Sequence, residues 1–142
     1  MPVSLFGLSC DLDPFMELAK KHNINIQLLN IVGWVNETQK DINFIKQWLR
    51  DHTRYKDILN LQFGGTLGIF PNTWLESNFD KLGLERVNDT PQGWVNRQID
   101  STPEKRAQWA LDINKLAKSL GYTVAENLDN HYVLESMIND KI

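Results

Sequence analysis

The chain has 142 residues, of which 42% are hydrophobic and 10% aromatic, and this composition fits one globular domain with a continuous core. Its net charge is -3, and its 15 lysines and arginines are scattered among 18 acids, which argues against a nucleic-acid partner. The single cysteine excludes an internal disulfide, a four-cysteine zinc site and an iron–sulfur cluster held by this chain alone.

No apolar run of about 18 residues is present, and the amino-terminal segment lacks a basic stretch followed by a long apolar one. The sequence therefore predicts no membrane partner and no secretory signal. We expect a cytoplasmic protein.

The first half of the chain alternates strand and helix signals. Residues 3–8 (VSLFGL) are apolar without alternation, which is typical of a strand covered on both faces, and residues 13–22 predict a helix with Asp13 as its cap. Residues 24–32 (INIQLLNIV) predict a second strand. Thr38 and Asp41 then form a Thr-x-x-Asp capping pattern ahead of a second amphipathic helix.

The same order repeats once more. Residues 58–63 (ILNLQF) predict a strand that ends in a pair of glycines, and a short helix over 73–82 stops at Gly83. Strands separated by helices imply parallel pairing through right-handed crossovers, so we expect an α/β fold with parallel strands.

The remaining residues predict a long connection followed by a helical tail. Residues 85–102 are rich in turn formers, with one short extended piece at Trp94 and Val95, and loops of this length often cover a site. Ser101 or Thr102 caps a strong helix that ends at Gly121. A short strand at 122–127 and a closing helix at 131–138 complete the chain.

In parallel sheets ligands gather beyond the carboxyl ends of the strands, where loops and helix amino termini converge. Three segments are expected there: residues 9–11, 33–38 and 64–73. Gly64 and Gly65 let a ligand approach the backbone and Thr66 adds a hydroxyl, but no complete phosphate-loop motif is present, and a turn that ends a strand explains both glycines equally well.

Other candidate residues each have a structural alternative. Glu37 is either a site carboxylate or an acid favoured in the first turn of a helix, and Asp11 and Asp13 have the same two interpretations. His131 and Glu135 are spaced like metal ligands, but a surface pair explains them better. No catalytic assembly and no metal site are predicted.

Five tryptophans are many for this length, and aromatic rings can stack on a flat ligand. Trp48 and Trp109 follow helical periodicity and are expected in the core. Trp34, Trp74 and Trp94 fall in or beside connecting segments, where a site role is more plausible.

The run AKKHNINIQLLNIVGWVNETQKDINFIKQWLRD, followed by ILNLQFGGTLGIFPNTWLE, resembles the second half of the barrel in radical S-adenosylmethionine enzymes. The resemblance is best over residues 19–76. That family shows a strand Asn-x-Ile-Val-Gly, then Glu-Thr-x-x-Asp opening a helix, and a later loop of the Pro-Gly-Thr-x-Leu type, in which Asn72 takes the glycine place. The resemblance implies a partial (β/α) barrel over residues 1–84, with residues 85–142 as a connection and tail packed on the same domain.

Carried over by residue, the resemblance implies that Ile31 and Gly33 lie beside the adenine of S-adenosylmethionine. Ser9 would stand at the ligand-facing end of the preceding strand. Gly64, Gly65 and Thr66 would follow the next strand, where the family closes over cofactor or substrate.

The sequence differs from the family in two respects. It lacks the cysteine triplet that binds the [4Fe–4S] cluster, and it has Leu29 where the family often has an earlier glycine. We therefore expect the carboxyl-terminal portion of a radical S-adenosylmethionine protein, made by a split or truncated reading frame. It would position adenine and a small-molecule substrate, and would associate with a complementary amino-terminal half or with itself. The competing hypothesis is a non-catalytic α/β binding or interaction module.

Overall fold

The computed structural model describes residues 11–125, and within them helices and strands alternate along the chain. Three helix–strand pairs build the layered part of the molecule: α1 (Asp13–Lys21) and β1 (Ile26–Val32), α2 (Gln39–Asp51) and β2 (Leu59–Thr66), α4 (Pro103–Ser119) and β5 (Thr123–Val124). A short 3-10 turn, η1 (Thr53–Tyr55), lies between α2 and β2. The predicted strand over 3–8 and helix over 131–138 lie outside the described residues.

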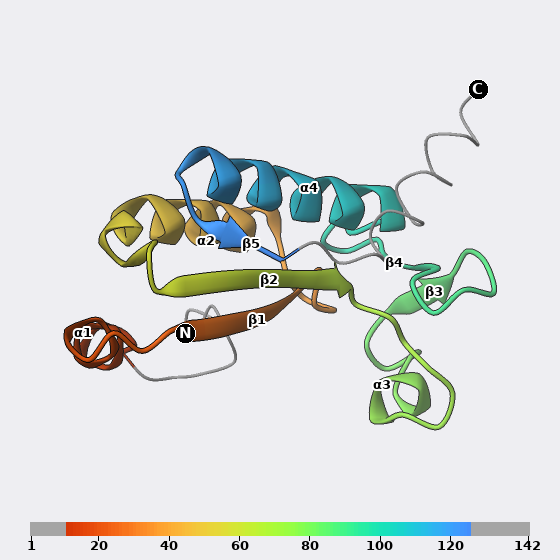
Figure 1. Cartoon of the computed structure of the whole chain (residues 1–142). Helices are drawn as coiled ribbons and strands as arrows, with labels where there is room; N and C mark the ends of the chain where they lie inside the picture. The colour runs from red at the N-terminus through yellow and green to blue at the C-terminus, as the bar shows by residue number, and fades with distance from the viewer. Residues whose placement is uncertain (1–10, 126–142) are drawn as a thin grey trace.

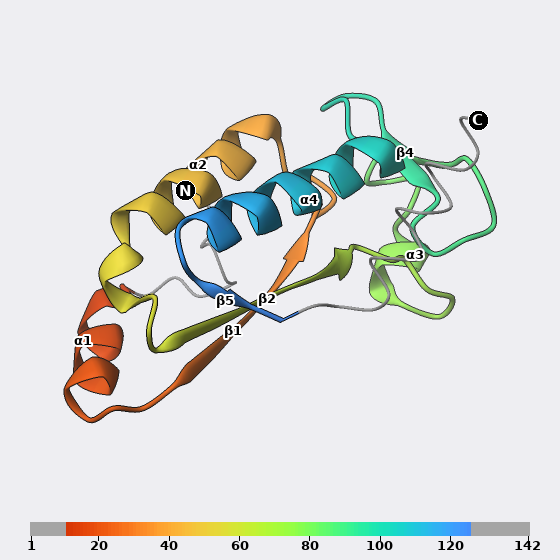
Figure 2. The same cartoon turned by 45° about the horizontal axis from the view of Figure 1, so that its top comes forward.

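The strands pair in parallel in the order β1-β2-β5, which confirms the predicted α/β class with parallel strands. Helices α2 and α4 lie side by side on one face of this sheet, as Figures 1 and 2 show. Along β1 the side chains alternate between half-buried and exposed, so that Ile26 and Leu28 face the helices while Leu29 and Ile31 face away from them. Described elements therefore cover one face of the sheet, and none of them covers the face beside Leu29 and Ile31, the open face.

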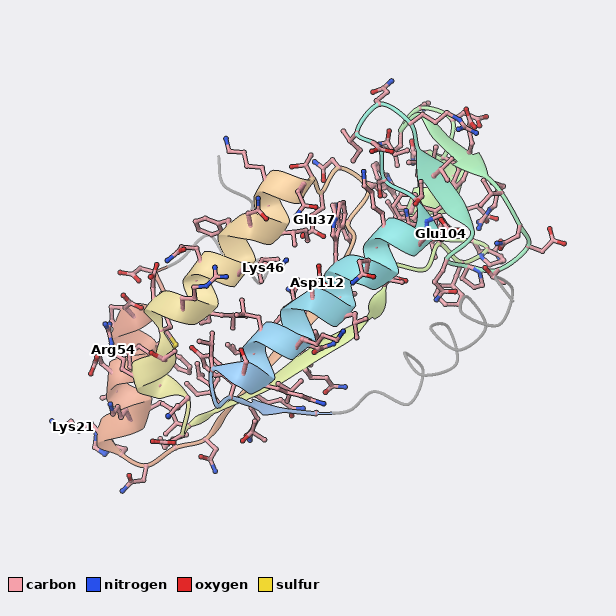
Figure 3. The ribbon with its side chains drawn as sticks, turned by 90° about the horizontal axis from the view of Figure 1, so that it is seen from above. Lys21, Glu37, Lys46, Arg54, Glu104 and Asp112 are labelled. Carbon is pink, nitrogen blue, oxygen red and sulfur yellow. The ribbon has the colours of Figure 1, made fainter. Side chains whose placement is uncertain are left out.

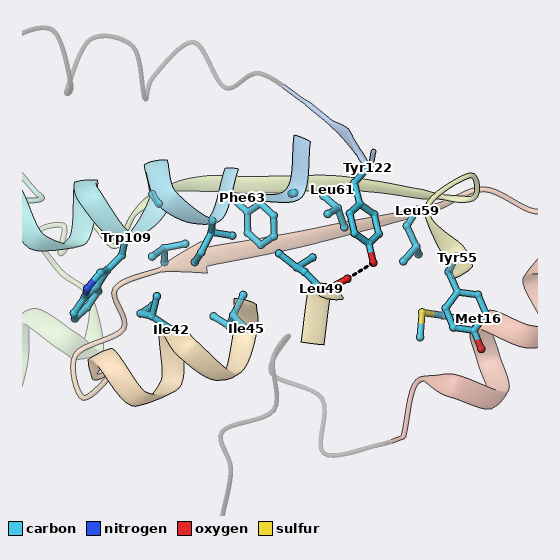
Figure 4. Packing of buried hydrophobic residues seen from close by; sticks show 14 of the residues in the cluster. Met16, Ile42, Ile45, Leu49, Tyr55, Leu59, Leu61, Phe63, Trp109 and Tyr122 are labelled. Carbon is cyan, nitrogen blue, oxygen red and sulfur yellow. Dashed lines mark hydrogen bonds between the residues drawn. The ribbon is translucent and has the colours of Figure 1, made fainter. Parts of the chain in front are cut away.

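The main core lies between the sheet and the two covering helices (Figure 4). Leu59, Leu61 and Phe63 of β2 project into it and meet Ile42, Ile45 and Leu49 of α2 together with Ile113 and Ala117 of α4. Tyr122 closes the core at the amino end of the sheet, where its hydroxyl donates a hydrogen bond of 2.8 Å to the carbonyl of Leu49. This carbonyl belongs to the last turn of α2, where no helical amide is left to donate to it.

Replacing Tyr122 by phenylalanine is expected to lower the free energy of unfolding by about 1–2 kcal/mol, because the Leu49 carbonyl loses its donor in a buried place. Burial also raises the pKa of the Tyr122 hydroxyl to about 12, so the bond stays intact through the neutral range. Urea unfolding followed by circular dichroism measures the change. Tyr55→Phe is the control, since the Tyr55 hydroxyl donates to Glu17, whose exposed carboxylate water can solvate; equal losses in both variants would contradict this account.

The helix caps agree in part with the sequence. The predicted Thr38–Asp41 pair is confirmed, because the Asp41 carboxylate accepts from both the amide and the hydroxyl of Thr38 at 2.8 Å. Of the two candidates for α4, Thr102 is the cap, accepting from the amide of Lys105 at 3.2 Å. The cap predicted at Asp13 is wrong, because Asp13 is already helical and Asp11 accepts from its amide instead.

Residues 67–101 form a smaller unit at the carboxyl end of β1 and β2 (Figure 1). It contains α3 (Trp74–Ser77) and an antiparallel hairpin of β3 (Leu84–Arg86) and β4 (Trp94–Asn96). The expected extended piece at 94–95 is therefore present, but the hairpin that it belongs to was not predicted, and the helix expected over 73–82 is shorter. A second buried cluster holds this unit: Val35, Leu67, Ile69, Leu84 and Trp94.

Figure 3 shows that α2 and α4 run in the same direction, with Glu37 and Glu104 near their amino ends. Lys46 and Asp112 lie between the two helices, 3.5 Å apart, and form a partly exposed ion pair. Such pairs contribute little to stability. Within residues 11–125 no helix combines the length and the apolar character needed to cross a membrane.

Candidate functional site

The carboxyl ends of β1 and β2 lie next to each other, as the parallel order requires. The ladder pairs Asn30 with Phe63 and then Val32 with Thr66, so one residue of β1, Ile31, stands opposite two residues of β2. These two are Gly64 and Gly65. The arrangement is a β-bulge, and beyond it the amide of Leu67 donates to the carbonyl of Val32 at 3.1 Å.

The two glycines do not form the turn that the sequence predicted. Both belong to β2, which continues to Thr66, so the strand ends three residues later than expected. Thr66 is half-buried beside Val32. Glycine at these two positions places bare backbone directly beside Ile31, and it is common where a strand bulges or where another group approaches the backbone closely.

Ile31 lies on the open face of the sheet, with 52% of its surface exposed. Leu29, one repeat earlier on the same face, is 64% exposed, and the side chains of Gln27 and Gln62 join across the strands through a hydrogen bond of 2.9 Å. This face therefore presents two aliphatic side chains, a paired amide and, opposite Ile31, glycine backbone.

Gly33 forms the corner after β1. Its φ of +85° lies in the left-handed region that favours glycine. A Cβ built on it would run into Cδ of Arg106 and come within 2.6 Å of Cγ. The corner therefore requires glycine for the packing of the protein itself, because the stem of Arg106 lies directly against the backbone.

Glu37 closes this corner from the other side. Its carboxylate accepts from the amide of Gly33 at 2.5 Å and from the amide of Trp34 at 3.2 Å. Glu37 precedes the N-cap of α2, so the expected place in the first turn of the helix is wrong; its carboxylate stabilises the turn between strand and helix. Burial raises the pKa of Glu37, while the two amide bonds act in the opposite direction and Asp41 adds to the rise.

This raised pKa makes a pH-dependent contribution to stability. Because the folded state binds the Glu37 proton more tightly than the unfolded state does, the contribution is fully present at low pH and is lost as pH rises through the folded pKa. Glu37→Gln keeps an acceptor but removes the titration. Between about pH 4 and pH 7 the variant is therefore expected to gain stability relative to the wild type as pH rises. Urea unfolding of both proteins at several pH values measures this difference, and parallel pH profiles would contradict it.

Arg106 is a buried residue that the sequence reasoning missed. It projects from α4 with no surface exposed, and its guanidinium lies over the ring of Trp94, with Cζ 3.6 Å from the ring centroid. The guanidinium donates to the hydroxyl of Ser101 at 3.0 Å and to the carbonyls of Gln92 and Trp94 at 2.9 and 2.7 Å. A signal was present in the sequence, since an arginine four residues before Ala110 and seven before Ile113 falls on the apolar stripe of the helix.

The tryptophans divide differently from the prediction. Trp109 lies in the core as expected, and Trp48 packs on the core and stacks on His52 with 4.1 Å between ring centroids. Trp34 and Trp74 are exposed, at 44% and 69%. The site role considered for Trp94 is wrong in the sense of direct ligand contact, because its ring is fully buried beneath Arg106.

The loop after β2 contains one further feature of note. Asn72, which takes the glycine place in the Pro-Gly-Thr pattern, has a φ of +63°, the region that glycine favours. Its amide donates to the carboxylate of Glu76 at 2.7 Å, and Thr73 caps α3 by accepting from the amide of Glu76. The loop therefore has a left-handed residue at Asn72, held by a bond from its own amide to Glu76.

No metal-binding group is found in the described part of the chain, counting clusters of three or more His, Cys, Asp or Glu side chains. Asp13 pairs with His52, its Oδ1 lying 2.8 Å from Nε2, which places it at the junction of α1 and α2. Ser9, His131 and Glu135 lie outside residues 11–125. Of the predicted site residues, Ile31, Gly33, Gly64, Gly65 and Thr66 are thus brought together at one edge of the sheet.

Comparison with known proteins adds no relative: no family model matches the sequence, and neither the curated proteins nor the solved structures include a significant match.

Proposed function

We propose that this chain is the carboxyl-terminal portion of a radical S-adenosylmethionine-type enzyme, in which the open face beside Ile31 receives the adenine of the cofactor. The observation that carries the proposal is the bulge, which sets Ile31 against the bare backbone of Gly64 and Gly65 on a face that no described element covers. The side chain of Ile31 can make apolar contact with a purine, and glycine at positions 64 and 65 leaves space for the purine ring.

Two further observations support the proposal. The corner at Gly33 and the loop at Asn72 both have left-handed backbone where the family pattern has glycine. The parallel order of β1 and β2, with α2 and α4 on one face of the sheet, agrees with a segment of a β/α barrel.

The cluster chemistry of that family does not fit this chain by itself. The sequence has one cysteine, whereas a [4Fe–4S] cluster is held by several cysteine thiolates. The proposal therefore assigns to these residues only the binding and orientation of adenine and substrate. It places the cluster on a complementary chain, which would complete the barrel.

Titration calorimetry with S-adenosylmethionine and S-adenosylhomocysteine tests the proposal on the 142-residue chain. Both ligands are expected to bind, and Ile31→Thr is expected to weaken binding about tenfold through lost apolar contact. Ile24→Thr is the matched control, because Ile24 is exposed to a similar degree, 55% against 52%, but precedes the amino end of β1. Absence of binding by the wild type, or equal weakening in the two variants, would overturn the assignment.

A non-catalytic module that keeps the α/β framework is the second candidate, and the missing cysteine triplet is the observation that favours it. Binding of S-adenosylmethionine by the chain alone, without any tendency to join a cluster-bearing partner on co-expression, would support the module. Light scattering distinguishes the two, because the enzyme portion is expected to form a complex and the module a stable monomer.

A further inference from the structure

We propose that Arg106 is a positioning residue for the carboxyl-edge site: it fixes residues 92–101 as a rigid wall beside the ends of β1 and β2 without contacting a ligand. This inference rests on the proposed function, since it concerns the same edge of the sheet. It assigns a role to the one fully buried cation of the described residues.

The head of the Arg106 side chain holds both ends of the wall. Its guanidinium donates to the carbonyl of Gln92 at the start of the segment and to the hydroxyl of Ser101 at its end, and it also donates to the carbonyl of Trp94. Three acceptors spread over ten residues are thus gathered by one rigid, planar donor group. A segment rich in turn formers gains a single conformation in this way.

The stem of the same side chain holds the corner after β1, because it packs where a side chain on Gly33 would otherwise lie. Two more bonds join the wall to the strand ends. Asn96 donates from Nδ2 to the carbonyl of Val35 at 2.9 Å, and Trp94 donates from Nε1 to the carbonyl of Leu67 at 3.0 Å. Hydrogen bonds therefore tie the segment that Arg106 orders to the chain just after β1, at Val35, and just after β2, at Leu67.

The chemistry of the position indicates a role beyond packing. No carboxylate of the described residues forms an ion pair with Arg106, its Nε has no hydrogen-bond partner, and burial lowers its pKa to about 10. An unpaired buried cation is costly, and apolar residues of similar volume often stabilise such places better. Local rules of this kind are broken most often at functional sites.

Two variants test the inference. Arg106→Lys keeps the charge but loses the planar fork, and Ser101→Ala removes one acceptor with a smaller change, so at least one folded variant is expected. Ile45→Val serves as the control. Ile45 belongs to α2 and its side chain lies in the main core, so this mild change lowers stability away from residues 92–101. In Arg106→Lys the affinity for S-adenosylmethionine is expected to fall about tenfold, while the control keeps wild-type affinity.

Amide hydrogen exchange gives a readout that needs no ligand. The amides of Leu67 and Asn96, which donate to Val32 and Ser101, are expected to exchange about tenfold faster in Arg106→Lys than in the control, whereas the amide of Ile26 is unchanged. Exchange and affinity both equal to those of the control would overturn the inference. Failure of the wild type to bind S-adenosylmethionine would overturn the proposed ligand, while faster exchange at Leu67 and Asn96 would still support the positioning role.

Discussion

Gly33→Ala is expected to lower the free energy of unfolding by about 2–5 kcal/mol. A left-handed φ costs an alanine roughly 1–2 kcal/mol, and the new methyl group, which would overlap the stem of Arg106, adds an overpacking cost of about 1–3 kcal/mol. Urea unfolding followed by circular dichroism measures the sum.

Gly121→Ala separates the two contributions. Gly121 has nearly the same φ, +88°, but a Cβ there would meet only the flexible side chain of Lys56 at 3.5 Å, so only the backbone cost of about 1–2 kcal/mol is expected. In an Arg106→Ala background Gly33→Ala should cost no more than Gly121→Ala does, because the obstacle has been removed. The packing account fails if Gly33→Ala and Gly121→Ala cost the same in the wild-type background.

Trp94→Ala is expected to cost about 3–5 kcal/mol, the larger of the two effects. The ring is fully buried in the second cluster, and it lies under the guanidinium of Arg106. Its removal leaves a cavity and takes the donor from the carbonyl of Leu67. Chemical denaturation monitored by far-ultraviolet circular dichroism is the measurement.

Trp74→Ala provides the comparison, since Trp74 is 69% exposed and its loss is expected to change stability by no more than about 0.5 kcal/mol. Trp94→Phe is the milder companion if Trp94→Ala does not fold; it keeps a ring beneath Arg106 and loses chiefly the indole hydrogen bond, for a cost of about 1–2 kcal/mol. A Trp94 variant as stable as the Trp74 variant would show that the second cluster contributes little.

Local patterns predicted much of the layered part of this fold. The apolar runs at β1 and β2, each next to an amphipathic helix, predicted the parallel order, because only a crossover connection joins such elements. The Thr38–Asp41 cap could also be read from sequence, since both partners lie within one turn. The parallel order also predicted that residues 33–38 and 64–73 would meet beyond the strand ends, whereas Ile31 was named only through the resemblance.

The features missed by the sequence depend on contacts between distant segments. Trp94 stands among turn formers, where a site role was considered for it, but α4 brings Arg106 over its ring and buries it. Glu37 was assigned to a helix that begins two residues after it, because the backward reach of its carboxylate to Gly33 depends on the shape of the turn. The β3–β4 hairpin was missed because strands of three residues are too short to show a recognisable alternation of apolar and polar residues.

The bulge at Ile31 also changes which residues at the end of β2 lie opposite those of β1. Strict alternation from Leu59, Leu61 and Phe63 would put residue 65 on the helix-covered side, yet the ladder pairs Thr66 with Val32, so one glycine is absorbed without a turn of the chain. Removing one glycine would restore one-to-one matching, with Thr66 still opposite Val32. Leu67, the next residue, already belongs to the second cluster, so the extra glycine sets the spacing along the chain between the two cores.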